Sequence, residues 1–258
     1  MRRIQFFIAG VQKGGTTALD QMLRKHPAIQ MATVKEVHFF DNDTVDWSAP
    51  NLDLLHSKFD WTNNHVVRGE ATPIYLYWPE SLARIRNYNL EARFIIGLRH
   101  PSFRAFSHWR MEFMRGNETL PFCEAIQEKA RHRVGNAPNG VHRIFSYLER
   151  GLYFPQIVRL LRLFPRHQIY FFRTDRLWSD QDHVLGEIQD FLGVNHDITV
   201  KKKYIVPINS SHLGVIPASS RKDLNQFFTE DIKLSAKETG LDLSDWLTID
   251  YQEPMTFE

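Results

Sequence analysis

A short apolar segment followed by a glycine-rich turn constrains the fold of this chain most. Residues 4–10 read IQFFIAG, a run that is rich in β-branched and aromatic residues and ends at a glycine. Such a run predicts a buried strand. Residues 11–15 (VQKGG) predict a turn, and residues 16–25 predict a helix that stops near His26-Pro27. A strand, a glycine turn and a helix within the first 25 residues indicate a βαβ unit.

Strands and helices are predicted to alternate along the rest of the chain. Further strands are predicted at residues 65–68, 93–98 and 168–172. Helices are predicted at residues 79–87, 103–115, 121–131, 153–164, 182–192 and 219–239. This alternation favours an α/β fold, in which helices cover both faces of a parallel sheet. Residues 41–64, 132–147 and 197–218 are predicted to be irregular and long enough to form binding loops.

Composition excludes several classes of protein. The 258 residues are 43% apolar and 24% charged, as in ordinary globular proteins, and no Pro/Gly/Ser-rich linker divides them. We therefore predict a single domain over residues 1–258. A net charge of +2, from 32 basic and 30 acidic residues, does not suggest a nucleic-acid partner. No apolar run approaches the roughly 18–20 residues of a membrane span, so no membrane partner is expected.

The expected compartment is the cytoplasm. The apolar stretch at the N-terminus breaks at Gln12-Lys13, which is too early for a signal peptide. A single cysteine, Cys123, excludes an intramolecular disulfide and makes a reducing cytosol the simplest compartment. The twelve histidines are scattered, without an HExxH motif or paired Cys/His spacing, so no metal site is predicted.

The turn after the first strand has the chemistry of an anion site. Glycines let the backbone turn tightly and direct its N–H groups into a concavity, and a helix N-terminus adds partial positive charge. Lys13 adds a full charge, and two threonine hydroxyls add donors. An ordinary strand–helix turn with a surface lysine is the alternative. The residues predicted to hold a phosphate or sulfate are Gln12, Lys13, Gly14, Gly15, Thr16 and Thr17.

This loop is not a Walker A sequence, because Lys13 precedes the glycine pair instead of following it. No carboxylate that would hold magnesium is evident at a downstream strand end, although phosphoryl transfer depends on Mg²⁺. A sulfuryl group carries less negative charge, so lysine, histidine and backbone donors suffice for its transfer. We therefore predict a P-loop-like sheet whose turn binds a phosphate or sulfate and requires no metal.

A second anion motif follows the strand at residues 93–98. Arg99 stands at the carboxyl end of that strand, where ligands bind in open α/β sheets, and Ser107 follows eight residues later on a helix. An arginine fork and a hydroxyl together can bind a second phosphate. The alternative is that Arg99 pairs with a carboxylate.

These motifs resemble those of the sulfotransferases that use 3′-phosphoadenosine 5′-phosphosulfate (PAPS). The QKGGTT turn is similar to the 5′-phosphosulfate loop of that family, and RHPSFRAFS, from Arg99 to Ser107, is similar to its 3′-phosphate motif. Residues 36–41 (EVHFFD) resemble a segment of the heparan sulfate sulfotransferase branch, in which the glutamate is the catalytic base. Residues 69–75, 150–153 and 189–193 resemble further family segments, so the resemblance covers about residues 4–194.

The sequence departs from that branch in two places. Ala71 stands where the branch has a lysine that works near the sulfate, which weakens the case for a glycosaminoglycan acceptor. The C-terminal Lys-x-Gly-Arg loop of the family is missing, and residues 212–217 (HLGVIP) are found instead. The lysines at 201–203 are an alternative means of closing the site; a solvated charge run is the simpler interpretation.

The resemblance implies a mechanism residue by residue. Glu36 is predicted to remove the acceptor proton, and Lys13 to stabilise charge on the leaving phosphate. His38 lies two residues from Glu36 and is predicted to orient it or to contact the sulfuryl group; His38 as the base is the alternative. Tyr153, Glu70 and Phe39 are candidate acceptor contacts, each with a structural alternative.

The predicted function is transfer of a sulfuryl group from PAPS to a hydroxyl or amine, with 3′-phosphoadenosine 5′-phosphate (PAP) as the product. The acceptor is expected to be a small soluble molecule, such as a secondary metabolite. A small-molecule kinase that uses ATP and magnesium is one alternative, and a nucleotide-binding module without catalysis is another. The identity of the acceptor and the oligomeric state stay open.

Overall fold

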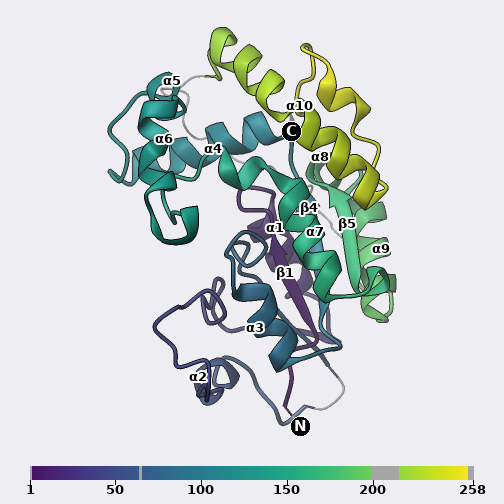
Figure 1. Cartoon of the computed structure of the whole chain (residues 1–258). Coiled ribbons are helices and arrows are strands. Elements are labelled where there is room, and N and C mark those ends of the chain that lie inside the picture. The colour runs from purple at the N-terminus through teal and green to yellow at the C-terminus, as the bar shows by residue number, and fades with distance from the viewer. Residues whose placement is uncertain (1, 64–65, 199–214, 255–258) are drawn as a thin grey trace. The chain divides into compact units, whose positions relative to one another are not determined.

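The computed structural model describes residues 2–63, 66–198 and 215–254 of the chain (Figure 1). Its contacts divide the chain into two compact units. The first unit comprises Met1–Leu98 and Arg159–Tyr204, and the second comprises Arg99–Val158 and Ile205–Glu258. The single domain predicted over residues 1–258 stays a prediction.

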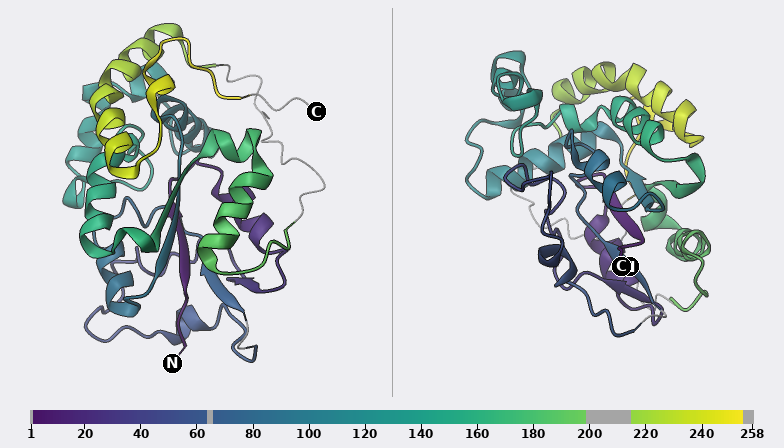
Figure 2. Two further views of the ribbon diagram at one scale, coloured as in Figure 1. Left: turned by 90° about the vertical axis from the view of Figure 1, so that its right-hand side faces the viewer. Right: turned by 60° about the horizontal axis from the view of Figure 1, so that its bottom comes forward.

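The first unit contains a five-stranded parallel sheet, as predicted for an α/β fold. Its strands are β1 (Phe6–Gly10), β2 (Ile29–Met31), β3 (Val67–Glu70), β4 (Arg93–Leu98) and β5 (Ile169–Arg173). They stand in the order β2-β3-β1-β4-β5, and every described pair is parallel. Figure 2 shows β1 in purple, running through the middle of this unit from the start of the chain. The central strand β1 therefore ends between the carboxyl ends of β3 and β4.

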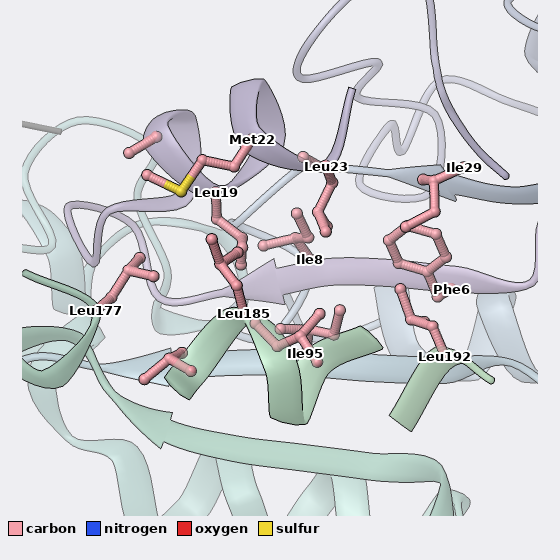
Figure 3. Packing of buried hydrophobic residues seen from close by; sticks show 14 of the residues in the cluster. Phe6, Ile8, Leu19, Met22, Leu23, Ile29, Ile95, Leu177, Leu185 and Leu192 are labelled. Carbon is pink, nitrogen blue, oxygen red and sulfur yellow. The ribbon is translucent and has the colours of Figure 1, made fainter. Parts of the chain in front are cut away.

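Helices cover both faces of this sheet. On one face, α1 (Thr16–Leu23), α8 (Thr174–Ser179) and α9 (Gln181–Leu192) pack against β1 and β4. Figure 3 shows Leu19 of α1 and Leu185 of α9 against Ile8, and all three are at most 1% exposed. On the other face, Phe7 of β1 stacks on Phe94 of β4 at 5.9 Å. Alternate residues of β1 thus serve opposite faces, as the period of a strand requires.

The other face carries α3 (Ser81–Tyr88) and the end of α7 (Tyr153–Leu163), and α2 (Asp53–His56) follows β2 along the chain. Phe164, just past α7, packs on Phe94 at 4.5 Å, and Leu82 of α3 is fully buried. This packing of helices on the sheet excludes water from the apolar side chains between them, and the burial stabilises the fold.

The second unit is helical in its described part. Its α-helices are α4 (Pro101–Met114), α5 (Phe122–Ala125), α6 (Glu128–Gly135), the start of α7 and α10 (Ala218–Thr239). Its described 3₁₀ turns are η1 (Pro138–Gly140), η2 (Glu149–Gly151) and η5 (Ser244–Leu247), and a further turn, η3 (Arg166–Gln168), belongs to the first unit. Asp231 of α10 accepts hydrogen bonds from the amides of Tyr153 and Phe154 at 2.7 and 3.0 Å. This carboxylate caps the positive N-terminus of α7 and fixes it against α10.

Several element boundaries were predicted wrongly. Strand β2 was missed because three residues, one of them Gln30, carry too short a pattern. The helix predicted over 121–131 is two helices, because Gln127 is extended, with ψ of 154°, and caps α6. Helix α2 lies inside the segment 41–64, which was predicted to be irregular, and α8 was missed altogether. Strand β3 ends two residues later than predicted, which places Glu70 at its carboxyl end.

Candidate active site

The loop between β1 and α1 is held in place by backbone contacts inside the first unit. The amide of Val11 donates to the Gly97 carbonyl at 3.1 Å, and the amide of Gly14 donates to the Val11 carbonyl at 2.9 Å. The hydroxyl of Thr174 donates to the Gly14 carbonyl at 3.2 Å. A Cβ on Gly14 would lie 2.8 Å from the Gly97 oxygen, closer than real Cβ atoms approach. Gly14 therefore has no room for a side chain, and the loop packs tightly on β4.

The N-terminus of α1 is open to an anion. Gly15 caps the helix in the left-handed conformation at φ 75°, and no side chain caps its first turn. The first amides of a helix have no partner within it, so they remain donors for a ligand. Thr17 is exposed on this turn, Gln12 and Lys13 are half-buried, and Thr16 is buried. These residues fit the 5′-phosphosulfate of PAPS, since the loop supplies amides, a hydroxyl and a cation together.

The segment that carries Glu36 is fixed by residues just past β3. The amide of Glu36 donates to the Ala71 carbonyl at 3.0 Å, and the amide of Val37 donates to the Glu70 carboxyl at 3.2 Å. The amides of the next three residues donate to the hydroxyls of Thr72 and Tyr75 at 3.2–3.5 Å. Five consecutive amides are therefore anchored to β3 and its extension. Because β3 lies beside β1, the anchored Glu36 segment and the Lys13 loop both lie at the carboxyl ends of this strand pair.

Glu36, His38 and Asp41 form a chain of charged groups. The His38 Nδ1 lies 2.9 Å from an oxygen of Asp41, and its Nε2 lies 3.5 Å from Glu36. Asp41 is fully buried, whereas His38 and Glu36 are 44% and 38% exposed. Lys35 contacts the other oxygen of Glu36 at 2.5 Å. The buried carboxylate thus orients the imidazole, and the imidazole faces the candidate base.

These contacts set the charges of the group. The hydrogen bond to His38 is the main reason that the pKa of Glu36 falls to about 2, and Lys35 lowers it further. The hydrogen bond to Asp41, followed by that to Glu36, raises the pKa of His38 to about 9. At neutral pH, Glu36 is therefore a carboxylate and His38 an imidazolium.

The backbone is strained at the same residues. Among the described residues other than glycine, positive φ occurs at Lys13 (70°), Glu36 (61°), His38 (53°) and Asn139 (58°). This conformation costs an ordinary residue about 1–2 kcal/mol, so surrounding contacts must compensate for it. Three of the four positions are the candidate catalytic residues. Such clustering is typical of functional sites.

The structure places the three candidate acceptor contacts inside the fold. Glu70 is fully buried, and burial raises its pKa to about 7. Phe39 is 5% exposed and packs on Phe40 and Trp47. Tyr153 is fully buried in the second unit, where its hydroxyl donates to the Arg99 carbonyl at 2.6 Å. Their roles as acceptor contacts stay predictions.

In the second unit, Arg99 is paired with a carboxylate. Its Nε and one terminal nitrogen each donate to an oxygen of Glu253 at 2.6 Å. The side chains are only 15% and 13% exposed. Burial favours the neutral form of Arg99, but the Glu253 carboxylate outweighs it and raises the pKa of Arg99 above its usual value. The alternative considered for Arg99, a carboxylate partner, is what the structure contains.

Ser107 and the C-terminal tail complete this region. Ser107 is buried on α4, and its hydroxyl makes no hydrogen bond within the described residues. Tyr251 of the tail stacks on His100 at 4.9 Å, and its carbonyl accepts from Arg221 at 2.6 Å. The tail is thus docked beside Arg99. The candidate closing residues at 201–203 and 212–214 lie outside the described residues.

Asp41 and Glu253 are the residues that sequence reasoning missed. Asp41 stood at the end of the quoted EVHFFD segment, and its spacing of three from His38 was the available signal. Glu253 lies 154 residues from Arg99 in the sequence, so no local pattern predicts the contact. In the described ranges there is no group of three or more His, Cys, Asp or Glu side chains placed to hold a metal ion. Within the same ranges, every helix is too short or too polar to span a bilayer.

The charge chain predicts a pH-dependent stability. Because the folded pKa of His38, about 9, exceeds its ordinary value of 6.5, the ion pair stabilises the fold fully below pH 6.5. This contribution is lost as the pH rises through about 9. Asp41→Asn should therefore cost about 1–2 kcal/mol of unfolding free energy near pH 6, and clearly less near pH 10. Urea unfolding at both pH values measures this difference; a pH-independent cost would contradict the assigned pair.

Comparisons with known proteins show the family to which the chain is similar. The model of the sulfotransferase domain family matches residues 3–209. The chain is 33% identical over 200 residues to human heparan sulfate glucosamine 3-O-sulfotransferase 3B1, covering 78% of this chain and 48% of that protein. It is 25% identical to the membrane-associated sulfotransferase kil1 of Dictyostelium discoideum, covering 74% of this chain and 56% of that protein. The chain thus spans about half the length of the curated relatives it matches.

A solved structure supports the same grouping. A sulfotransferase from Alicyclobacillus acidocaldarius matches 95% of this chain and 99% of its own, with a TM-score of 0.80 and 28% identity. The family model matches residues 3–209, which is well over half of the chain. The chain therefore belongs to the sulfotransferase family.

Proposed function

We propose that this chain transfers the sulfuryl group of PAPS to a hydroxyl or amine of a small soluble acceptor. One observation carries the proposal: an uncapped helix N-terminus with Lys13 follows the carboxyl end of β1, and an ionised Glu36 is anchored to Ala71 at the carboxyl end of the neighbouring strand β3. Such an edge is where α/β sheets bind ligands. Membership of the sulfotransferase family supports PAPS as the donor.

The residues of this chain have separate tasks. When bound, PAPS supplies the sulfuryl group and leaves as PAP. Lys13 and the first amides of α1 hold the 5′ group, and Lys13 stabilises negative charge on the leaving phosphate. The Glu36 carboxylate removes the proton from the hydroxyl or amine of the acceptor substrate. Arg99 and Ser107 are assigned to the 3′-phosphate.

The charge state of the site favours Glu36 over His38 as the base. An imidazolium has no lone pair to accept a proton, and the pKa of His38 near 9 keeps it protonated at neutral pH. Glu36 is ionised but weakly basic while His38 holds it, since that contact is the first cause of its low pKa. Any movement that loosens the contact between His38 and Glu36 makes Glu36 a stronger base. Acceptor binding beside His38 would therefore raise the basicity of Glu36.

The 3′-phosphate and Glu253 compete for the same guanidinium in this proposal. Arg99 presents its fork to the two carboxylate oxygens of Glu253 at 2.6 Å. A phosphate offers oxygens in a matching geometry, so the fork suits either anion but not both. We infer that Glu253 leaves Arg99 when the donor binds.

The acceptor proposal departs from the named relatives. Several of them are heparan sulfate glucosamine 3-O-sulfotransferases by name. Ala71, whose carbonyl holds Glu36, stands where the heparan branch has the lysine that works near its acidic acceptor. One cation is therefore missing beside the candidate base, which favours a less acidic acceptor, such as a secondary metabolite. We propose the cytoplasm as the compartment.

Calorimetry with PAP in EDTA tests the donor proposal, with ATP plus magnesium as the comparison. We expect metal-free binding of PAP, weaker binding of ATP, and at least about tenfold weaker PAP binding by Lys13→Ala. Lys25→Ala is the matched control, because Lys25 is exposed at the other end of α1. Absent PAP binding, or magnesium-dependent preference for ATP, would overturn the donor assignment and favour a kinase.

A further inference from the structure

The first unit contains a cavity that the proposed reaction does not use. Its volume is about 490 Å³, and its walls include Arg2, Phe40, Trp47, His56, Arg84 and Tyr88. The hydroxyl of Tyr88 accepts the amide of Ile4 at 2.8 Å, which places the cavity beside the start of β1. The Lys13 loop follows the other end of β1, as the course of that strand shows (Figure 1, Figure 2). The cavity is therefore separate from the loop.

The cavity carries a positive charge. Three arginines, Arg2, Arg3 and Arg84, line it, and none of the described lining residues is acidic. Arg84 pairs with Asp43 at 2.8 Å, just outside the lining. Arg2 is exposed and lies 5.8 Å from the Trp61 ring, and it forms no ion pair with a described residue. At least one guanidinium at the entrance thus keeps its full capacity to bind an anion.

The walls suit a flat apolar body. Phe40 is fully buried, and Trp47 stacks on it at 6.0 Å with an interplanar angle of 27°. The Arg84 guanidinium lies 4.5 Å from the Trp47 ring centre, held by the Phe40 carbonyl at 2.9 Å. Planar rings and a fixed guanidinium form surfaces on which another ring can stack.

A hydrogen-bond relay provides a further donor. The Tyr88 oxygen accepts from the Ile4 amide and lies 3.0 Å from the His56 Nε2, and we assign the Tyr88 proton to this second contact. With this assignment His56 carries its own proton on Nδ1, and no described residue accepts a hydrogen bond from that N–H. Burial, followed by the charge of Arg2, lowers the pKa of His56 and keeps the ring neutral.

We propose that this cavity binds a small organic anion with a flat apolar body, such as an aromatic carboxylate, sulfate or sulfonate. The rings would contact its body, and Arg2 and the His56 N–H would bind its charged group. Phe40 directly precedes Asp41, and Tyr75 anchors the Phe40 amide at 3.4 Å. Occupancy of the cavity would therefore stabilise the segment that holds His38.

Titration calorimetry with 2-naphthalenesulfonate as the probe tests this proposal, with 2-naphthylmethanol as the neutral analogue. We expect one saturable site for the anion and about tenfold weaker binding of the neutral analogue. Arg2→Glu should weaken anion binding about tenfold or more, because it reverses an exposed charge without removing a core contact. Leu52→Glu, at a half-buried position in the lining, should do the same.

Lys25→Glu is the matched control, because it makes the same charge change at an exposed position just past α1. It should leave probe binding unchanged, and saturating PAP should not displace the probe. Equal affinity for the anion and the neutral analogue, or insensitivity to both cavity variants, would overturn the proposal. Displacement by PAP would also overturn it, because the probe would then occupy the donor loop. Failure of PAP itself to bind tests only the donor proposal.

Discussion

Glu36→Gln is expected to lower kcat by roughly 10²–10⁴-fold, with the affinity for PAP close to that of the unmodified chain. The amide has nearly the shape of the carboxylate but cannot accept the acceptor proton. The position of the segment should survive, because the amides of residues 36 and 37 donate to Ala71 and Glu70 through the backbone. The loss is therefore chemical and not structural.

The measurement is single-turnover sulfation with PAPS, using the fastest acceptor found in a panel of phenols, alcohols and amino sugars. Glu91→Gln serves as the control, since Glu91 is an exposed glutamate of the same unit. Calorimetry with PAP shows whether donor binding is kept. Near-normal turnover of Glu36→Gln would remove Glu36 as the base. A comparable loss in His38→Gln alone would then return the role to His38.

The sequence was sufficient for the parts of this fold that rest on local patterns. Residues 4–10 are apolar apart from Gln5, and the turn after them contains the glycine pair Gly14-Gly15. Both features are visible without a structure. The parallel direction of β1, β3 and β4 follows from the alternation of strands and helices, whereas their order in the sheet was not predicted. Strand β2 was not predicted because its three residues, only two of them apolar, are too few to show the alternating pattern of a strand.

The candidate site was predictable in its residues but not in its electrostatics. Glu36 and His38 were found from their two-residue spacing and their motif. The raised pKa of His38 depends first on Asp41, whose complete burial is a tertiary property, and the lowered pKa of Glu36 depends in turn on His38. Glu70 was expected at the acceptor, but its burial and its bond to the Val37 amide give it a part in positioning the segment. A single sequence records neither burial nor contacts between distant segments.

Arg99→Ala is expected to weaken PAP binding by about 10²-fold or more, whereas Glu253→Gln should strengthen it about tenfold. The first change removes the two-pronged partner of the 3′-phosphate. The second removes the charge that occupies the fork, so a larger fraction of molecules is ready to bind. The apparent affinity for PAP rises in proportion to the fraction of molecules in the binding-competent state. Calorimetry with PAP on each variant measures both effects.

The double variant separates competition from mere proximity. If Glu253 acts only through Arg99, adding Glu253→Gln to Arg99→Ala should bring no further gain, so the two effects are strongly non-additive. Asp250→Asn is the matched control, because it removes an exposed charge three residues earlier in the same tail. An unchanged PAP affinity in Glu253→Gln would mean that the tail does not compete with the donor. A gain that persists without Arg99 would place the competition elsewhere, and Arg99 would then be a structural partner of the tail.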